Sequence, residues 1–199
     1  ETNLLSDKNL RAVHFVDATT GWAAGDGGTI YQTSDGGKRW TPIRNATLAG
    51  AVVDVNRIYF LNEKRGWMLA ESRDKDQTKT VLLSTEDGGK IWQHFEVPNV
   101  SSFFFVDGKR GWAVGKNSTM LRTTDGGLKW KAVENLTRLV GLPVESASLT
   151  FGFSDVYFLK GGEIGWAVGN FYGTTTTNIG GLFMTTNSGD SWQRIPIAV

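Results

Sequence analysis

The 199-residue chain contains no cysteine, so neither disulfide bonds nor thiol chemistry can contribute to its fold or function. No apolar run approaches the ~18 residues that a transmembrane helix requires. Basic and acidic residues are interspersed and leave a formal net charge of +1. Because a nucleic-acid-binding protein needs a concentrated basic stripe, we expect no nucleic-acid partner and no transmembrane segment.

Residues typical of catalytic and metal sites are also scarce. There are two histidines, and His14 lies in an apolar segment where a packed side chain is a better interpretation than a metal ligand. Asp74-Lys75-Asp76 has the first residues of a calcium-binding loop, but the glycine and glutamate that such a loop needs do not follow. No phosphate-binding Gly-x-x-x-x-Gly-Lys-Ser/Thr loop is present. We therefore expect no catalytic residues, no cofactor and no metal.

What the chain has instead is a fourfold internal repeat marked by its rarest residues. All eight tryptophans occupy two equivalent positions in the four copies. The first position follows a glycine and recurs after 45, 45 and 54 residues, at Trp22, Trp67, Trp112 and Trp166, and we expect these four indoles to be buried and to serve packing. A phenylalanine precedes each Gly-Trp pair, at Phe15, Phe60, Phe105 and Phe158. A period near 45 residues indicates a repeat architecture, with copies at approximately 9–43, 53–97, 100–133 and 154–197.

Each copy divides into four short segments that read as β-strands. In the first copy they are Arg11–Val16, Gly21–Gly25, Thr29–Ser34 and Lys38–Ile43. They are rich in β-branched and aromatic residues and are bounded by turn residues, which is typical of strands. Four strands per 45-residue repeat predict an all-β fold, a β-propeller of four-stranded antiparallel blades. Up-and-down barrels and β-sandwiches are the alternatives, but neither requires strict repetition of a four-strand unit.

The number of copies leaves the closure of the propeller open. Residues 1–199 are expected to form a single propeller domain. Propellers close with 4–8 blades, so four copies allow a compact four-bladed ring or part of a larger propeller. We expect the ring if the 199 residues are the whole protein. The first residue is Glu1 rather than Met, which makes a processed or partial chain the other expectation.

The turn before the second tryptophan of each copy is nearly invariant. It contains Asp or Asn, then glycine, then tryptophan: Asp35, Gly37, Trp40; Asp87, Gly89, Trp92; Asp125, Gly127, Trp130; and Asn187, Gly189, Trp192. The Asp or Asn side chain can accept hydrogen bonds from the turn backbone, and glycine supplies the positive φ of a tight hairpin. This turn resembles the Asp-box, or BNR repeat, of sialidases and sortilin-type receptors. The resemblance implies a structural hairpin between the third and fourth strands, and Asn187 agrees because it lacks the charge that catalysis would use.

The Gly-Trp motif narrows the resemblance to one family of Asp-box proteins. Its clearest copies are Gly21-Trp22-Ala23-Ala24-Gly25, Gly111-Trp112-Ala113-Val114-Gly115 and Gly165-Trp166-Ala167-Val168-Gly169. Together with the Asp-box, they resemble the photosystem II stability and assembly factor family across nearly the whole chain. The resemblance implies a non-enzymatic scaffold that docks on a protein partner, such as a membrane-protein complex. It also implies an extracytoplasmic location, in a periplasm, a thylakoid lumen or outside the cell. The departure is that family members usually carry more blades than the four visible here.

The longer insertions predict where a partner would bind. Successive strands of a blade are antiparallel, so second-to-third connections and links between blades emerge at one end of the blades, and Asp-boxes emerge at the other. All four insertions are of the first kind: Arg44–Val55, Ala70–Lys79, Val133–Ser154 and Asn170–Gly180. Binding sites often lie on loops carried by a rigid scaffold, and exposed apolar side chains mark interaction sites. The candidate partner-binding residues are Leu139, Leu142, Phe151, Phe153, Phe171 and Tyr172, with Arg73, Lys75 and Arg138 at the rim.

Two interpretations of these insertions and of the whole fold stay open. The insertions could instead cap the propeller channel or pack on one another. The propeller could be a carbohydrate-active or glycan-binding protein, like other Asp-box propellers, rather than a protein-binding scaffold. A glycan site would need exposed aromatic side chains beside acidic ones near the channel.

Overall fold

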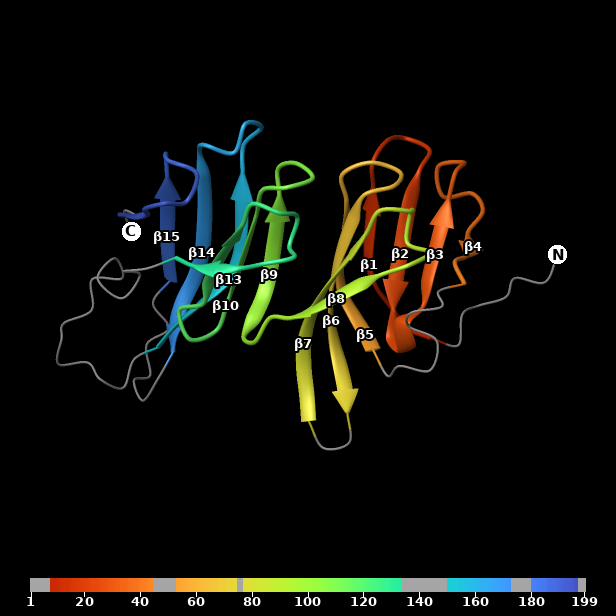
Figure 1. Ribbon diagram of the computed structural model, residues 1–199, viewed down its shortest axis with the longest axis horizontal. Coiled ribbons are helices and arrows are strands. Elements are labelled where there is room, and N and C mark those ends of the chain that lie inside the picture. The colour runs from red at the N-terminus through yellow and green to blue at the C-terminus, as the bar shows by residue number, and fades with distance from the viewer. Residues whose placement is uncertain (1–7, 45–52, 75–76, 134–149, 173–179, 197–199) are drawn as a thin grey trace. The chain divides into compact units, whose positions relative to one another are not determined.

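The predicted all-β fold is confirmed by a computed structural model, which describes residues 8–44, 53–74, 77–133, 150–172 and 180–196 (Figure 1). In these ranges sixteen strands form four antiparallel sheets of four, each sheet built from strands consecutive in the sequence. None of the helical residues in the described part forms a helix long and apolar enough to cross a membrane. The only helical turn in these ranges is the short 3-10 turn η1, Asp26–Gly28.

The strands fall into two compact units, Glu1–Pro98 and Asn99–Val199, and each unit holds two sheets. The sheets of the first unit contain β1 (Leu10–Phe15), β2 (Gly21–Gly25), β3 (Ile30–Thr33) and β4 (Thr41–Pro42), then β5 (Val53–Phe60), β6 (Gly66–Asp74), β7 (Gln77–Thr85) and β8 (Gln93–Glu96). Those of the second contain β9 (Val100–Phe105), β10 (Gly111–Gly115), β11 (Met120–Thr123) and β12 (Lys131–Ala132), then β13 (Thr150–Phe158), β14 (Gly165–Tyr172), β15 (Gly180–Thr185) and β16 (Gln193–Ile195). The expectations of a single domain and of a closed ring stay predictions.

The pairing of the first two strands explains why glycine precedes each second-strand tryptophan. In the second sheet Phe60 lies directly opposite Gly66 across the β5–β6 pair. The Phe60 ring lies over the glycine so closely that a Cβ at Gly66 would come within 2.5 Å of it. Glycine is therefore required for steric reasons. The next residue, Trp67, points to the opposite face of the sheet because side chains alternate along a strand.

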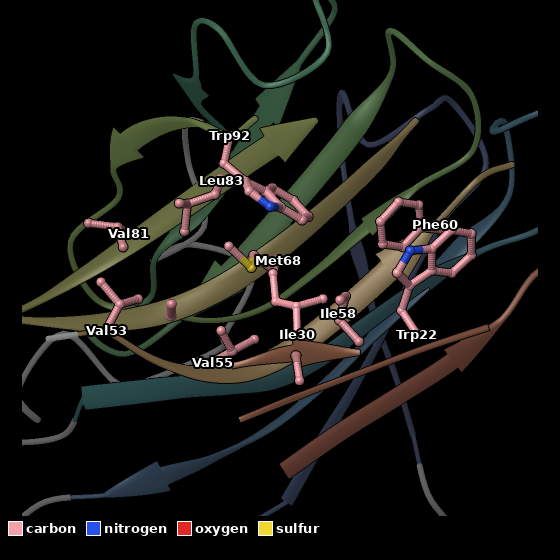
Figure 2. Close-up of a cluster of buried hydrophobic side chains, with 12 residues drawn as sticks. Trp22, Ile30, Val53, Val55, Ile58, Phe60, Met68, Val81, Leu83 and Trp92 are labelled. Atoms are coloured by element: carbon pink, nitrogen blue, oxygen red, sulfur yellow. The ribbon is translucent and has the colours of Figure 1, made fainter. Parts of the chain in front are cut away.

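The core of the first unit lies between its two sheets (Figure 2). The Trp22 indole, from the first sheet, stacks on the Phe60 ring of the second with a centroid distance of 3.7 Å and an interplanar angle of 6°. Its Nε1 also donates a hydrogen bond to the Gly88 carbonyl in the second Asp-box turn, at 3.2 Å. We call this arrangement the blade joint: a second-strand tryptophan stacked on the first-strand phenylalanine of the next sheet and hydrogen-bonded to its Asp-box.

The second unit repeats the blade joint. Trp112 stacks on Phe158 with a centroid distance of 3.6 Å, and its Nε1 donates to the Ser188 carbonyl at 3.1 Å. The aliphatic side chains of Val114, Met120 and Val156 complete the buried core around this stack. Burying aromatic side chains of this size contributes several kcal/mol each to stability. Within each unit, Trp22 or Trp112 therefore defines how one blade packs on the next.

Two details differ from the sequence-based expectations. The segment Ala70–Lys79, expected to be an enlarged loop, is mostly strand, because β6 and β7 pair from Gly66–Thr85 out to Asp74–Gln77. This hairpin extends beyond the other strands of its sheet (Figure 1). The second-strand tryptophans were expected to be buried, and Trp22, Trp67 and Trp112 are, but Trp166 is only half-buried. Trp166 differs because no following sheet in the described residues supplies its half of a blade joint.

Candidate interaction sites

The four Asp-boxes form the same hydrogen-bonded turn between the third and fourth strands. In the first, Asp35 Oδ1 accepts hydrogen bonds from the Thr33 hydroxyl and the Arg39 backbone N–H, both at 2.9 Å. The Thr33 hydroxyl oxygen in turn accepts from the Gly37 N–H at 3.0 Å. Gly37 has a φ of 85°, which side-chain-bearing residues rarely adopt. The Asp35 carboxylate and the Thr33 hydroxyl therefore bond to the turn itself.

The electrostatics of the boxes agree with a structural role. The hydrogen bond from the Arg39 backbone N–H holds the pKa of Asp35 below its ordinary value, against a smaller opposing effect of desolvation. The Lys129 backbone N–H lowers the pKa of Asp125 in the same way. In the fourth box, Asn187 Oδ1 accepts from Thr185 Oγ1 at 2.9 Å and from the Ser191 N–H at 3.0 Å. An uncharged amide thus makes the same two contacts as the carboxylates.

The opposite end of the first unit carries a network of ion pairs, which we call the connection-end network. It joins the start of β1, the η1 turn, the start of β5 and the far part of β6. Arg11 Nε donates to Asp26 Oδ1 at 2.6 Å, and Arg73 donates to Asp54 Oδ2 at 2.7 Å. Asp54 Oδ1 also accepts from the Gly27 N–H at 3.1 Å. The buried Asp54 carboxylate therefore connects the two sheets at this end.

The arginines of this network keep part of their surface in solvent. The Arg73 side chain is 55% exposed and that of Arg11 is 40% exposed, although each forms an ion pair. The Asn9 side-chain amide, with help from Arg11, holds the pKa of Asp26 below its ordinary value. Because the carboxylates orient the guanidinium groups, the remaining N–H donors are presented in a defined geometry. Such donors suit carboxylate or peptide carbonyl oxygens.

The predicted partner-binding residues do not form one surface in the structure, because some are exposed and others are buried. Arg73 belongs to the connection-end network, as described above. Phe151, Phe153 and Phe171 were expected to be exposed, which is wrong, because they are buried and pack with Phe183 in the core of the second unit. Their burial follows from the strands β13 and β14, which extend into the predicted insertions and turn these rings inward. Tyr172 ends β14, and its side chain lies outside the described part.

The remaining candidates, Lys75, Arg138, Leu139 and Leu142, lie outside the described residues. Sequence reasoning also missed Arg11, Asp26 and Asp54, which the fold brings to Arg73. No local motif marks them, since the partners are separated by 15 and 19 residues. Only the pairing of β5 with β6 could have indicated the contact between Asp54 and Arg73. It places the start of β5 beside the far part of β6, with Asp54 opposite Glu71.

The described ranges contain no cluster of side chains that could bind a metal ion. No group of three or more His, Asp or Glu side chains there could hold a metal ion. The Nε2 atom of half-buried His14 lies 2.9 Å from the Phe60 carbonyl oxygen, and burial is the main cause that lowers its pKa. It therefore packs in the first blade joint, beside Tyr59.

These features define a class of protein: an Asp-box β-propeller array whose repeated residues are structural. The family model described as photosynthesis system II assembly factor YCF48 matches residues 1–100 and again residues 96–198. The chain therefore belongs to this family, as the Gly-Trp and Asp-box motifs had indicated.

Individual relatives agree with this assignment. A photosystem II assembly lipoprotein Ycf48 from Synechococcus sp. (strain CC9902) is 23% identical over 142 residues, covering 68% of this chain and 35% of that protein. The chloroplastic photosystem II stability/assembly factor HCF136 of Arabidopsis thaliana is 27% identical over 124 residues, covering 58% of this chain and 26% of that protein. The alignments thus span about a third or less of the length of these relatives.

Solved structures share the fold at low sequence identity. A YCF48 bound to D1 peptide superimposes with a TM-score of 0.54 and 17% identity, over 96% of this chain and 83% of that one. The GH74 xyloglucanase from Xanthomonas campestris superimposes with a TM-score of 0.63 and 14% identity, over 94% of this chain and 30% of that one. At these identities the likeness establishes the propeller fold, which enzymes and assembly factors share.

Proposed function

We propose that the chain is a non-enzymatic assembly scaffold that binds a protein partner at the end of its blades where the second-to-third connections lie. Family membership supports the assembly role, because the matching relatives are photosystem II assembly factors. The observation that carries the location is the connection-end network, whose half-exposed Arg11 and Arg73 are held by Asp26 and Asp54. At the Asp-box end of the first unit the Asp35 carboxylate bonds to its own turn, and Arg65, which pairs there with Glu86, is only 20% exposed.

The partner segment that suits these arginines is an extended peptide of a membrane protein, with carboxylate or carbonyl oxygens facing the guanidinium groups. A structural relative was solved with a D1 peptide, which makes that peptide a suitable first probe. On the same reasoning we place the protein on the extracytoplasmic side of a membrane, as an assembly lipoprotein or lumenal factor would be. The carbohydrate-binding alternative is not favoured, because Asp26 and Asp54 are already paired with arginine.

The test is binding of a fluorescent D1 peptide, measured by anisotropy at low and high salt. Arg73→Ala is expected to weaken binding about tenfold, the loss of one charge-assisted contact of ~1.4 kcal/mol. Arg39→Ala is the matched control: it removes an arginine from the same unit, but from the Asp-box turn at the other end. The proposed location would be refuted if the Arg73 variant bound the peptide as tightly as the unmodified protein does while the Arg39 variant bound it more weakly. No binding by the unmodified protein would refute the D1-type peptide as ligand.

A further inference from the structure

The first blade joint contains a titratable side chain at a position where the second joint has a phenylalanine. His14 of β1 lies directly opposite Trp22 across the β1–β2 pair, and its ring packs on Tyr59 of β5 at a centroid distance of 4.7 Å. In the second unit the same two positions hold Phe104 and Tyr157, whose ring centroids lie 4.9 Å apart. A ring at this position therefore serves packing in both units, and the imidazole adds a group that can take up a proton.

The contact between His14 and the second sheet determines which ring nitrogen carries the proton. Nε2 lies 2.9 Å from the Phe60 carbonyl oxygen. Because a carbonyl oxygen only accepts hydrogen bonds, the neutral imidazole donates from its Nε2–H and keeps Nδ1 unprotonated. This hydrogen bond joins the first sheet to the backbone of Phe60, on whose ring Trp22 stacks. A further proton therefore enters at Nδ1 and gives the half-buried ring a positive charge.

The surroundings of His14 do not compensate a positive charge. Of the two strands packed on β1 in the described residues, β2 has no titratable side chain, and β5 carries Asp54, Arg57 and Tyr59. Asp54 pairs with Arg73 at the connection end, whereas the Arg57 cation is near enough for its charge to act on the imidazole. Burial is the main cause that lowers the pKa of His14, partly opposed by its backbone hydrogen bond, and Arg57 lowers this pKa further.

We infer that His14 is a pH-sensitive contact of the first blade joint. While the imidazole is neutral, its ring contact and its hydrogen bond hold the first sheet on the second. Protonation places a charge between the two sheets beside the Arg57 cation, and the first sheet is loosened from the second. The loosening extends to the connection-end network, where Arg11 of the first sheet donates to Asn56 of the second at 3.3 Å. The joint of the second unit does not respond, because Phe104 cannot be protonated.

The direction of the pH effect follows from the lowered pKa of His14. A histidine whose pKa is lower in the folded chain than in the unfolded chain contributes stability that is complete above the unfolded pKa of about 6.5 and is lost as the pH falls through the folded pKa. The urea unfolding midpoint should therefore decline from about pH 7 to about pH 5. The chain has two histidines and no cysteine, and carboxylates ordinarily titrate at about pH 4, so histidine dominates this range.

Two substitutions of His14 separate titration from packing. His14→Phe copies Phe104 of the second unit, and His14→Gln keeps an N–H donor for the Phe60 carbonyl but cannot titrate. In both variants the urea midpoint should lose most of its decline over this pH range. Loss of packing alone would lower the midpoint equally at both ends of the range and leave the decline unchanged. His94→Gln is the matched control, because it removes the other histidine, which is exposed on β8, and this variant should decline as the unmodified chain does.

Hydrogen exchange measured by mass spectrometry locates the effect within the chain. After correction for intrinsic exchange rates, the amides of β1 and β2 should lose protection at the acidic end of the range, whereas those of β9 and β10 in the second unit should keep it. The proposal is overturned if the unmodified chain has the same urea midpoint across the range or if both His14 variants decline as the unmodified chain does. It is also overturned if the protection of β1 and β9 changes alike.

Discussion

Replacing Gly66 by alanine tests whether the Gly-Trp motif is conserved between repeats for packing reasons. A Cβ at this position would lie 2.5, 2.6 and 2.7 Å from three atoms of the Phe60 ring, against about 3.5–4.0 Å for a comfortable carbon contact. The ring would have to move by roughly 1 Å. It cannot move freely, because Trp22 stacks on its other face at 3.7 Å and Trp92 packs against its edge.

Overpacking of this kind costs about 1–3 kcal/mol, partly offset by the ~0.4–1 kcal/mol that replacing glycine gains through the unfolded state. We expect a net loss of roughly 1–2 kcal/mol, or a melting temperature lower by about 2–8 °C for a chain of this size. Thermal and urea unfolding followed by tryptophan fluorescence measure this loss.

The matched control is Gly108→Ala, where the added Cβ has no atom within 4 Å. This variant should be as stable as the unmodified chain or slightly more stable. In a Phe60→Ala background, which lacks the ring, Gly66→Ala should no longer lower the free energy of unfolding. A double-mutant cycle would show this as a coupling between the two positions. Equal stability of the Gly66 and Gly108 variants, or no coupling to Phe60, would refute the steric explanation.

Three further predictions concern the joints and the boxes. Trp22→Ala should destabilise the protein by about 3–5 kcal/mol in urea unfolding, as for other buried tryptophans, and Trp166→Ala should cost less because its indole is only partly buried. Asp35→Asn should be nearly silent at neutral pH, since Asn187 makes the same contacts, whereas Gly37→Val should be destabilising because Gly37 has a φ of 85°; the reverse order of stabilities would contradict this. The pKa values of Asp35 and Asp125 are lowered in the folded state. The stability that these two carboxylates contribute is therefore present above their ordinary pKa of roughly 4 and is lost as the pH falls through their folded pKa values. Below pH 4 the urea unfolding midpoint should accordingly decline less steeply with falling pH in an Asp35→Asn, Asp125→Asn double variant than in the unmodified chain.

The fold could be predicted from the sequence because the same residues recur at the same structural positions. The second-strand prediction Gly21–Gly25 matches β2, and the predicted first strand Arg11–Val16 differs by one residue at each end from β1, Leu10–Phe15. The glycines bound these strands and the tryptophans mark their buried faces. The predicted fourth strand, Lys38–Ile43, was too long, because the box itself extends to Trp40 and leaves β4 as Thr41–Pro42.

The candidate site could be predicted only in part, because its residues do not recur and their contacts are distant in sequence. Arg73 was identified by its position in an insertion, but its partner Asp54 depends on the register of β5 and β6. Phe151, Phe153 and Phe171 were misread because an insertion was taken to mean a loop, although β13 and β14 continue through it. Alternating aromatic residues such as Phe151-Gly152-Phe153 are typical of a strand with one buried face.

The contrast between repeated backbone and unrepeated side chains indicates where function resides in such an array. At the connection end of the first sheet, the Asp26 N–H donates to the Asn9 carbonyl at 2.9 Å, and at the same place in the third sheet the Lys116 N–H donates to the Asn99 carbonyl at 2.7 Å. The backbone is the same, but Arg11 and Asp26 form an ion pair in the first sheet, where the third has Ser101 and Lys116. Since the shared backbone contact serves the fold in both sheets, selection for the fold alone does not require the ion pair. The half-exposed Arg11 and Arg73 are therefore the residues of this network whose substitution should alter binding, whereas the buried Asp54, which connects the two sheets, also serves the fold.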